Sequence, residues 1–232
     1  KLTGYMLNWI LHGALSIQTY HYYLAFPKDR IFIKVLVYGV YFIEVIQSSV
    51  ATYDAFTAFG SGNFSRLSQM RLSGVSGAIL GGLIACIGQS YYAYRIRVLS
   101  RSRVIPLFVI LISMLQLAAG LMTGILVCKE KNASELRIIS YTWTGSSALC
   151  DAVIACYMTF FLLRQDTDFK TTRRLLRRLV RLSVETGVVT ASMAITTLVL
   201  ITAFPIEIYF MAVAGTISKW YSNTLLVILN SR

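Results

Sequence analysis

The chain has 232 residues, of which 56% are hydrophobic and only 14% are charged, and its formal net charge is +12. A typical soluble domain has roughly a quarter charged residues, so this composition excludes an ordinary soluble protein and indicates a membrane protein. Most Lys and Arg lie between long apolar segments, so we expect them to contact anionic lipid headgroups of the bilayer, and we expect no nucleic-acid partner.

Seven apolar segments follow one another along the chain, each long enough to cross a hydrocarbon core of roughly 30 Å as a helix. The prolines fall at the boundaries of these segments, which supports the division. The predicted fold is all-α, a polytopic membrane protein whose seven-transmembrane-helix bundle forms a single domain over residues 1–232. The predicted spans are 4–26, 31–59, 72–94, 104–127, 138–163, 182–204 and 206–229.

The distribution of basic residues predicts the orientation of the bundle. The connections after the first, third and fifth spans and the C-terminal end hold most of the Lys and Arg. By the positive-inside rule, we expect the N-terminus outside and the C-terminus in the cytosol. Two glycosylation sequons, at Asn63 and Asn132, lie in loops that this topology places outside, where glycans are added. The plasma membrane and the endoplasmic reticulum both fit this orientation.

The most basic stretch, residues 164–181, lies between the fifth and sixth spans and mixes Arg with Leu and Val. This pattern predicts a cytosolic helical extension that lies against the headgroups, with a cytosolic protein partner as the alternative. Glu185 is expected to pair with Arg181, four residues earlier on the same helix. The residues expected to contact anionic lipids are Arg173, Arg174, Arg177 and Arg178.

The third span is rich in small residues. Ser73, Gly77 and Gly81 recur at intervals of four, and Gly74 and Gly82 narrow the helix further. In a membrane this spacing is typical of a helix whose backbone packs closely against a neighbour. We therefore expect the third span to have a close helical partner.

Five runs spread over the whole chain carry a family resemblance. They are GYMLNW at 4–9, YYLAFPKD at 22–29, DAF at 54–56, LVRLSVETG at 179–187 and KWYSNTLLVILNSR at 219–232. These runs resemble those of a large family of basidiomycete seven-helix membrane proteins that is known as a domain of unknown function. The resemblance implies the seven-helix fold and a fungal source, and it supplies no catalytic or binding residues.

Three ionisable residues are expected near the middle of the membrane. Glu44, Asp151 and Lys219 each come about 13 residues into their spans, which at roughly 1.5 Å per residue is close to the midplane. Charges are costly in hydrocarbon, so these side chains should face the bundle interior, where they could form one buried charge cluster.

Further polar residues share helical faces with these three and predict a polar central pocket that holds water. The alternative is that the same groups only bond the helices to one another. No metal site is expected, since no residues have metal-ligand spacing. The candidate ligand-binding residues are His12, Glu44, Gln47, Asp54, Gln116, Ser147, Asp151, Lys219 and Asn223.

Four functions fit these features, and we favour the first. It is a receptor or sensor that binds a small hydrophobic or amphipathic ligand, although the chain lacks the Asp-Arg-Tyr and Asn-Pro-x-x-Tyr motifs of typical G-protein-coupled receptors. The second is a membrane enzyme on a hydrophobic substrate, similar in outline to fungal terpene cyclases, with Glu44 or Asp151 as general acid. The third is a transporter or proton relay. The fourth is a retinal protein with Lys219 as the Schiff base, and retinal is the only cofactor considered.

Overall fold

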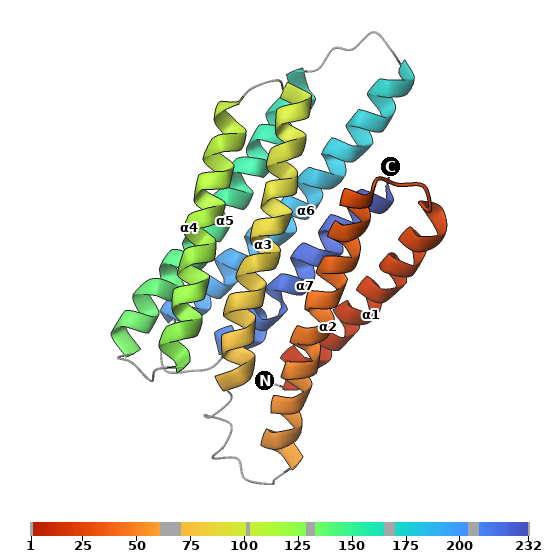
Figure 1. Cartoon of the computed structure of the whole chain (residues 1–232). Helices are drawn as coiled ribbons and strands as arrows, with labels where there is room; N and C mark the ends of the chain where they lie inside the picture. The colour runs from red at the N-terminus through yellow and green to blue at the C-terminus, as the bar shows by residue number, and fades with distance from the viewer. Residues whose placement is uncertain are drawn as a thin grey trace.

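The computed structural model of the chain describes residues 2–60, 71–100, 103–128, 133–164, 170–203 and 209–231. The described residues form seven α-helices and no strand (Figure 1), which confirms the predicted all-α fold. The helices are α1 (Leu2–Ala25), α2 (Ile31–Gly60), α3 (Arg71–Ser100), α4 (Val104–Cys128), α5 (Ala133–Arg164), α6 (Lys170–Ala203) and α7 (Tyr209–Asn230).

Four of the helices contain segments that are long and apolar enough to cross a membrane, judged on the described residues. These segments are Ile31–Thr57, Gly74–Ser100, Val104–Val127 and Ile138–Phe161, and α6 adds a shorter apolar segment, Gly187–Leu200. Large apolar side chains on the outside of the bundle are open to the surroundings, for example Phe42 and Leu111, which are 65% and 60% exposed. The helices therefore indicate a membrane-embedded protein whose outer surface suits contact with lipid.

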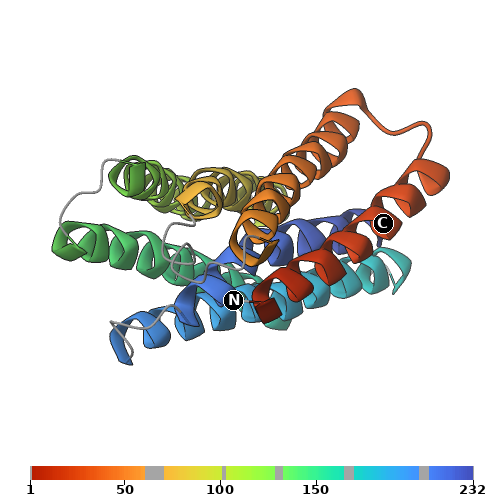
Figure 2. The same cartoon turned by 90° about the horizontal axis from the view of Figure 1, so that it is seen from below.

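Helix α7 lies inside the bundle, with α1 and α2 on one side of it and α3 and α6 also against it (Figures 1 and 2). Helix α3 packs against α2, α4, α5 and α7, so α3 and α7 together connect the two sides of the molecule. Helices that follow one another along the chain run in opposite directions (Figure 1). A residue at the middle of α7 is therefore within reach of several helices at similar depth.

Three predicted spans were clearly shorter than their helices, since α5 begins at Ala133 and not near residue 138, and the other two are the third and sixth. Helix α3 continues to Ser100 and α6 begins at Lys170, so the helical character predicted for the basic stretch before the sixth span is confirmed from Lys170 onward. The predicted pair between Arg181 and Glu185 is also confirmed, with Arg181 Nε donating to Glu185 Oε1 at 2.8 Å. Hydropathy marks only the apolar part of a helix, whereas the backbone bonds continue into its polar ends.

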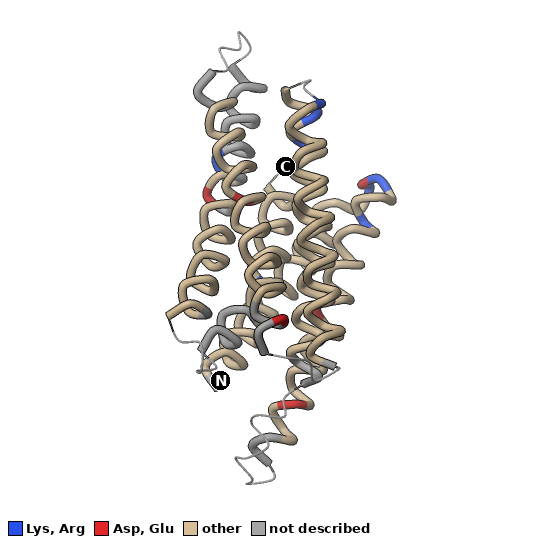
Figure 3. The backbone as a smooth tube through the Cα atoms, turned by 90° about the vertical axis from the view of Figure 1, so that its left-hand side faces the viewer, with Lys and Arg blue, Asp and Glu red and all other residues tan. Residues whose placement is uncertain are grey.

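Lys and Arg residues gather mainly at one end of the bundle, among the residues that Figure 3 describes. This is the end that carries the C-terminus and the turn between α1 and α2. In that turn, Lys34 Nζ donates to the carbonyl oxygen of Pro27 at 2.6 Å and Tyr22 donates to Asp29 Oδ2 at 2.9 Å. The end is thus both basic and locally ordered by side-chain hydrogen bonds.

Helices α3 and α4 approach each other closely through small residues. A Cβ added at Gly120 of α4 would lie 2.9 Å from the carbonyl oxygen of Ala78 and 3.7 Å from the Cα of Gly82, both in α3. One turn along α4, a Cβ at Gly124 would lie 2.7 Å from Cγ1 of Ile79. The close partner expected for the third span is therefore α4, and the contacts of α3 with it include Ala78, Ile79 and Gly82, whereas Gly77 has open space around it.

Candidate functional site

Lys219 of α7 and Glu44 of α2 form an ion pair in the interior, and both side chains are 0% exposed. Lys219 Nζ also donates to the backbone carbonyl oxygen of Glu44 at 2.9 Å. Ser222, which lies nearly one turn further along α7, donates to the other carboxylate oxygen of Glu44 at 2.6 Å. We call Glu44, Lys219 and Ser222 the ion-pair network. Because each charge has its counter-charge and further hydrogen bonds, much of the large desolvation cost of burying them is offset.

Hydrogen bonds to α1 and α2 surround the ion-pair network. Ser218 donates to Gln47 Oε1 at 2.9 Å, and Gln47 is buried. Asn223 Nδ2 donates to the carbonyl oxygen of Leu11 at 3.1 Å, and Asn223 Oδ1 accepts from Gln18 Nε2 at 3.3 Å. The polar face of α7 that carries Lys219 is therefore bonded to both α1 and α2.

A second set of polar residues joins α3, α5 and α7. Tyr221 donates its hydroxyl hydrogen to Asp151 Oδ2. Gln89 Nε2 donates to the other oxygen, Asp151 Oδ1, at 3.1 Å. The hydroxyls of Ser147 and Tyr221 are 2.9 Å apart, and Thr190 of α6 also faces the carboxylate. We call Gln89, Ser147, Asp151 and Tyr221 the carboxyl–tyrosine network.

The structure places Glu44, Asp151 and Lys219 in the interior but divides them between the two networks. Lys219 and Tyr221 are two positions apart on α7, and at 3.6 residues per turn they point about 200° apart around the helix axis. Lys219 therefore faces α2, whereas Tyr221 faces α3 and α5. The single charge cluster that was predicted from the similar depth of these three residues does not form, because α7 lies between Glu44 and Asp151.

Two other candidate residues, Asp54 and His12, are not members of either network. Asp54 is buried, but it follows Glu44 by ten residues, which is about 15 Å along α2. His12 is only half-buried and stacks on the ring of Tyr41, with ring centroids 5.7 Å apart, while its other contact is the edge of Trp9 at 5.9 Å. His12 thus belongs to an aromatic contact between α1 and α2.

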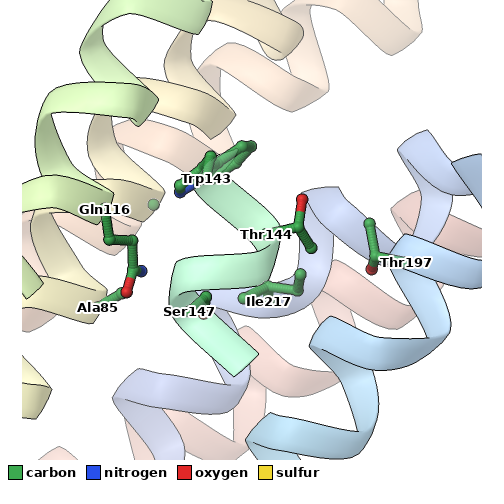
Figure 4. A pocket seen from close by; sticks show the side chains of 8 residues that line it. Ala85, Gln116, Trp143, Thr144, Ser147, Thr197 and Ile217 are labelled. Carbon is green, nitrogen blue, oxygen red and sulfur yellow. The ribbon is translucent and has the colours of Figure 1, made fainter. Parts of the chain in front are cut away.

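A small cavity lies beside the carboxyl–tyrosine network (Figure 4). Its free volume is about 10 Å³, which is close to the room that one water molecule needs. Ser147 of the network forms part of its wall, and Gln116, which is 1% exposed, contributes its amide. Neither Glu44 nor Lys219 adjoins it. The complete lining is Gly81, Ala85, Gln116, Trp143, Thr144, Ser147, Thr197 and Ile217.

Some candidates fall outside the described part of the chain. They are the sequons at Asn63 and Asn132 and the side chains of Arg173, Arg174, Arg177 and Arg178. Within the described part, no three His, Cys, Asp or Glu side chains come together as metal ligands.

Sequence analysis did not single out Gln89, Tyr221 or Ser222 as site residues. Gln89 carries the one side-chain amide of its predicted span, and the cost of burying an amide in hydrocarbon is a signal that could have identified it. Ser222 lies three positions after Lys219, so helical spacing places both on one face. Tyr221 gave no such signal, because a tyrosine in a membrane helix is more typical of the interface with water.

A comparison with protein families finds one match, a family of unknown function (DUF6534), at residues 147–232. The matched region runs from the middle of α5 to the end of the chain, so it includes Asp151, Lys219 and Tyr221 but neither Glu44 nor Gln89. No curated protein and no solved structure matches the chain. The similarity therefore covers all of the ion-pair network except Glu44 and all of the carboxyl–tyrosine network except Gln89, and it assigns no activity to either.

Proposed function

We propose that this chain is a receptor-like membrane sensor that binds a small hydrophobic or amphipathic ligand and responds by moving α7 relative to α2 and α5. The observation that carries the proposal is the buried ion pair between Lys219 and Glu44. Stability alone does not require such a pair, since apolar side chains of similar volume pack as well or better. Charged residues inside membrane helices more often belong to a functional pathway.

The ion pair suits a two-state element because it joins two separate helices through one side chain on each. In the resting state it holds α7 against α2, while the carboxyl–tyrosine network holds the opposite face of α7. A ligand shifts such an equilibrium only if it binds one arrangement of the helices better than the other. A ligand that favours the separated arrangement therefore has to overcome the attraction between Lys219 and Glu44.

The proposed sensor spans the membrane seven times, with the N-terminus outside and the C-terminus in the cytosol, in the plasma membrane or the endoplasmic reticulum of a fungal cell. The basic end of the bundle in Figure 3 supports this orientation, because basic residues favour the cytosolic side. Arg173, Arg174, Arg177 and Arg178 then face anionic headgroups or a cytosolic partner. Loss of mass on glycosidase treatment, abolished by Asn63→Gln with Asn132→Gln, tests the topology. Labelling of the C-terminus from outside intact cells would contradict it.

Ligand binding can be tested by thermal unfolding of the purified protein with long-chain alcohols, fatty acids and sterols added one class at a time. We expect at least one class to raise the unfolding temperature saturably. In Glu44→Gln, the midpoint concentration should fall several-fold, because weaker pairing with Lys219 leaves the binding-competent state more populated. The exposed Glu135→Gln is the matched control and should leave the midpoint unchanged. The sensor proposal fails if no class saturates, or if Glu44→Gln and Glu135→Gln behave alike.

A proton relay is the second candidate function, and a specific observation favours it. The hydroxyls of Ser147 and Tyr221 and the carboxylate of Asp151 form a continuous hydrogen-bonded chain within the bundle. Proteoliposomes with an internal pH-sensitive dye test this candidate. Proton flux that is present in the native protein and lost in Asp151→Asn would favour the relay over the sensor.

The enzyme and retinal alternatives receive less support from the geometry. Acid catalysis by Glu44 or Asp151 requires room for substrate beside the carboxyl group, and a Schiff base at Lys219 requires room for the retinal chain. The cavity described above holds about one water and does not adjoin Glu44 or Lys219. Both carboxylates are instead occupied by hydrogen bonds from neighbouring helices.

A further inference from the structure

We propose that the cavity between α3, α4, α5, α6 and α7 is a binding site for one ordered water molecule, held by Gln116, Ser147 and Trp143. This inference does not rest on the sensor proposal, because it concerns the protein without ligand. It follows from the free volume of the cavity, from three polar side chains among its lining residues and from the amide oxygen of Gln116.

The amide of Gln116 is the first observation that requires a partner in the cavity. Gln116 is 1% exposed, and its Oε1 accepts no hydrogen bond from the part of the chain that the structure describes. The residue lines the cavity, where Figure 4 shows its amide directed between α3 and α5. Buried polar atoms almost always have a hydrogen-bond partner, supplied by protein or by ordered water. The partner of Gln116 Oε1 must be a donor.

Ser147 supplies a second acceptor, as a count of hydroxyl hydrogens shows. Tyr221 has one hydroxyl hydrogen, which it donates to Asp151. The bond of 2.9 Å between the hydroxyls of Ser147 and Tyr221 is therefore donated by Ser147. Ser147 Oγ keeps its acceptor capacity and lines the cavity. Two further hydroxyls line the cavity, and both donate to their own helices: Thr144 to the carbonyl oxygen of Ser140 at 2.6 Å and Thr197 to that of Met193 at 2.9 Å.

Trp143 supplies the matching donor. Its side chain lines the cavity, and Figure 4 shows the nitrogen end of the indole ring on the side of Gln116. A water molecule has two hydrogens to donate, one to Gln116 Oε1 and one to Ser147 Oγ, and it can accept from the indole N–H. Three hydrogen bonds is the usual number for a buried water.

This water would extend the carboxyl–tyrosine network to α4. The chain of hydrogen bonds would then run from Asp151 through Tyr221 and Ser147 to the water and on to Gln116. It would reach a helix whose contact with α3 is otherwise made by close apolar packing. Replacement of Asp151 would then alter the hydrogen bonding of Gln116 even if the backbone did not move.

The experiment uses protein labelled with ¹⁵N in its tryptophans, Trp9, Trp143 and Trp220, and measures magnetisation transfer from water to each indole proton. Trp143→Phe assigns the Trp143 signal. We expect a direct transfer from water to the indole proton of Trp143. Trp220, whose buried Nε1 does not line the cavity, is the internal comparison, and its signal should be unchanged in every variant of the cavity wall.

Two variants and two matched controls decide the outcome. Gln116→Leu removes the acceptor, and Gly81→Ala adds a methyl group at the cavity wall, where it meets only Ser218 Cβ at 3.8 Å. Both should abolish the transfer to Trp143 while the indole signals of Trp9 and Trp220 stay in place. The controls, Ser113→Ala on α4 and Gly77→Ala on α3, alter residues that do not line the cavity and should retain it. The proposal is overturned if the native protein shows no transfer, or if Gln116→Leu and Gly81→Ala both keep it.

Discussion

The contact between α3 and α4 and the surroundings of α7 show two different ways of holding helices together in a membrane. Helix α4 reaches α3 through glycines, and no side chain separates Gly120 from the backbone of α3. Helix α7 instead reaches its neighbours through buried charges, amides and hydroxyls. Lipid is as apolar as leucine, so burial of apolar surface drives neither contact. Close backbone packing holds α3 against α4, whereas hydrogen bonds and the ion pair hold α7 against its neighbours.

The difference teaches where the molecule can change its arrangement. A contact made by interlocked backbones has one geometry, because any shift opens a gap or creates a clash. A contact made by a few directional bonds can be broken and formed again as a unit. From this comparison we expect α3 and α4 to stay together and α7 to be the helix that changes its contacts, as the proposed sensor requires.

The largest expected effect comes from breaking the ion pair on one side. Lys219→Met leaves the carboxylate of Glu44 buried without its counter-charge, and loss of one partner of a buried pair costs about 3–5 kcal/mol. We expect a fall of that size in the free energy of unfolding, measured by titration of mixed micelles with sodium dodecyl sulfate.

The double variant Glu44→Gln with Lys219→Met is the control for this prediction. It removes both charges while Ser222 keeps a hydrogen-bond partner, so it should be more stable than Lys219→Met alone. Equal stability of the single and double variants would mean that the charge of Glu44 is not the source of the loss.

An intermediate effect is expected from a methyl group between α3 and α4. In Gly120→Ala the new Cβ would lie 2.9 Å from the carbonyl oxygen of Ala78, and backbone atoms cannot move aside as side chains do. We expect a loss of about 1–3 kcal/mol in the free energy of unfolding, the usual range for overpacking. Gly39→Ala, where nothing lies within 4 Å of the new Cβ, is the matched control and should be neutral or stabilising. A tolerated Gly120→Ala would mean that the two helices can separate freely.

A smaller effect is expected from the carboxyl–tyrosine network. Tyr221→Phe removes one hydroxyl, and Asp151 keeps its bond from Gln89. Single interhelical hydrogen bonds in membranes contribute about 1 kcal/mol, so the free energy of unfolding should fall by about that amount. A loss as large as that of Lys219→Met would show that Asp151 depends on Tyr221 as strongly as Glu44 depends on Lys219.

The sequence predicted the number and order of the helices because apolar stretches alternate with polar or basic connections along the chain, and Pro27 and Pro106 mark two of the boundaries. It did not predict that α3 continues past Tyr94 to Ser100, since hydropathy ends before the hydrogen-bonded backbone does. Close packing of α3 was predicted from its small residues. The partner helix was not, because spacing describes one helix surface and carries no information about which neighbour lies against it.

For the candidate site, the depth of each residue along its span could be predicted from the sequence. The direction in which its side chain points around the helix axis could not. Glu44, Asp151 and Lys219 were expected to meet because they share a depth. Lys219 and Tyr221, which was not a predicted site residue, point to opposite sides of α7. Which helices each of them faces depends on how α7 is rotated within the bundle. Rotation is set by packing against several helices at once. No single residue or spacing in the sequence indicates this rotation, because it depends on all of those contacts together.

The smallest expected effect tests whether an ion pair stabilises the bundle wherever it lies or only when it is buried. Arg181 and Glu185 form a pair of similar chemistry on α6, with N–O distance 2.8 Å, but their side chains are 76% and 53% exposed. The hydrogen bond and charge of Glu185 raise the pKa of Arg181, so the guanidinium stays charged over the whole experimental range. Water already solvates both groups, and exposed pairs of this kind add little to stability. Arg181→Ala should therefore leave the free energy of unfolding unchanged within error, in the titration that detects Lys219→Met. A measurable loss would show that ion pairs stabilise this bundle even where both groups stay in water. The polar contacts of α7 would then differ from those elsewhere in the molecule in their number, and not in the way that they stabilise it.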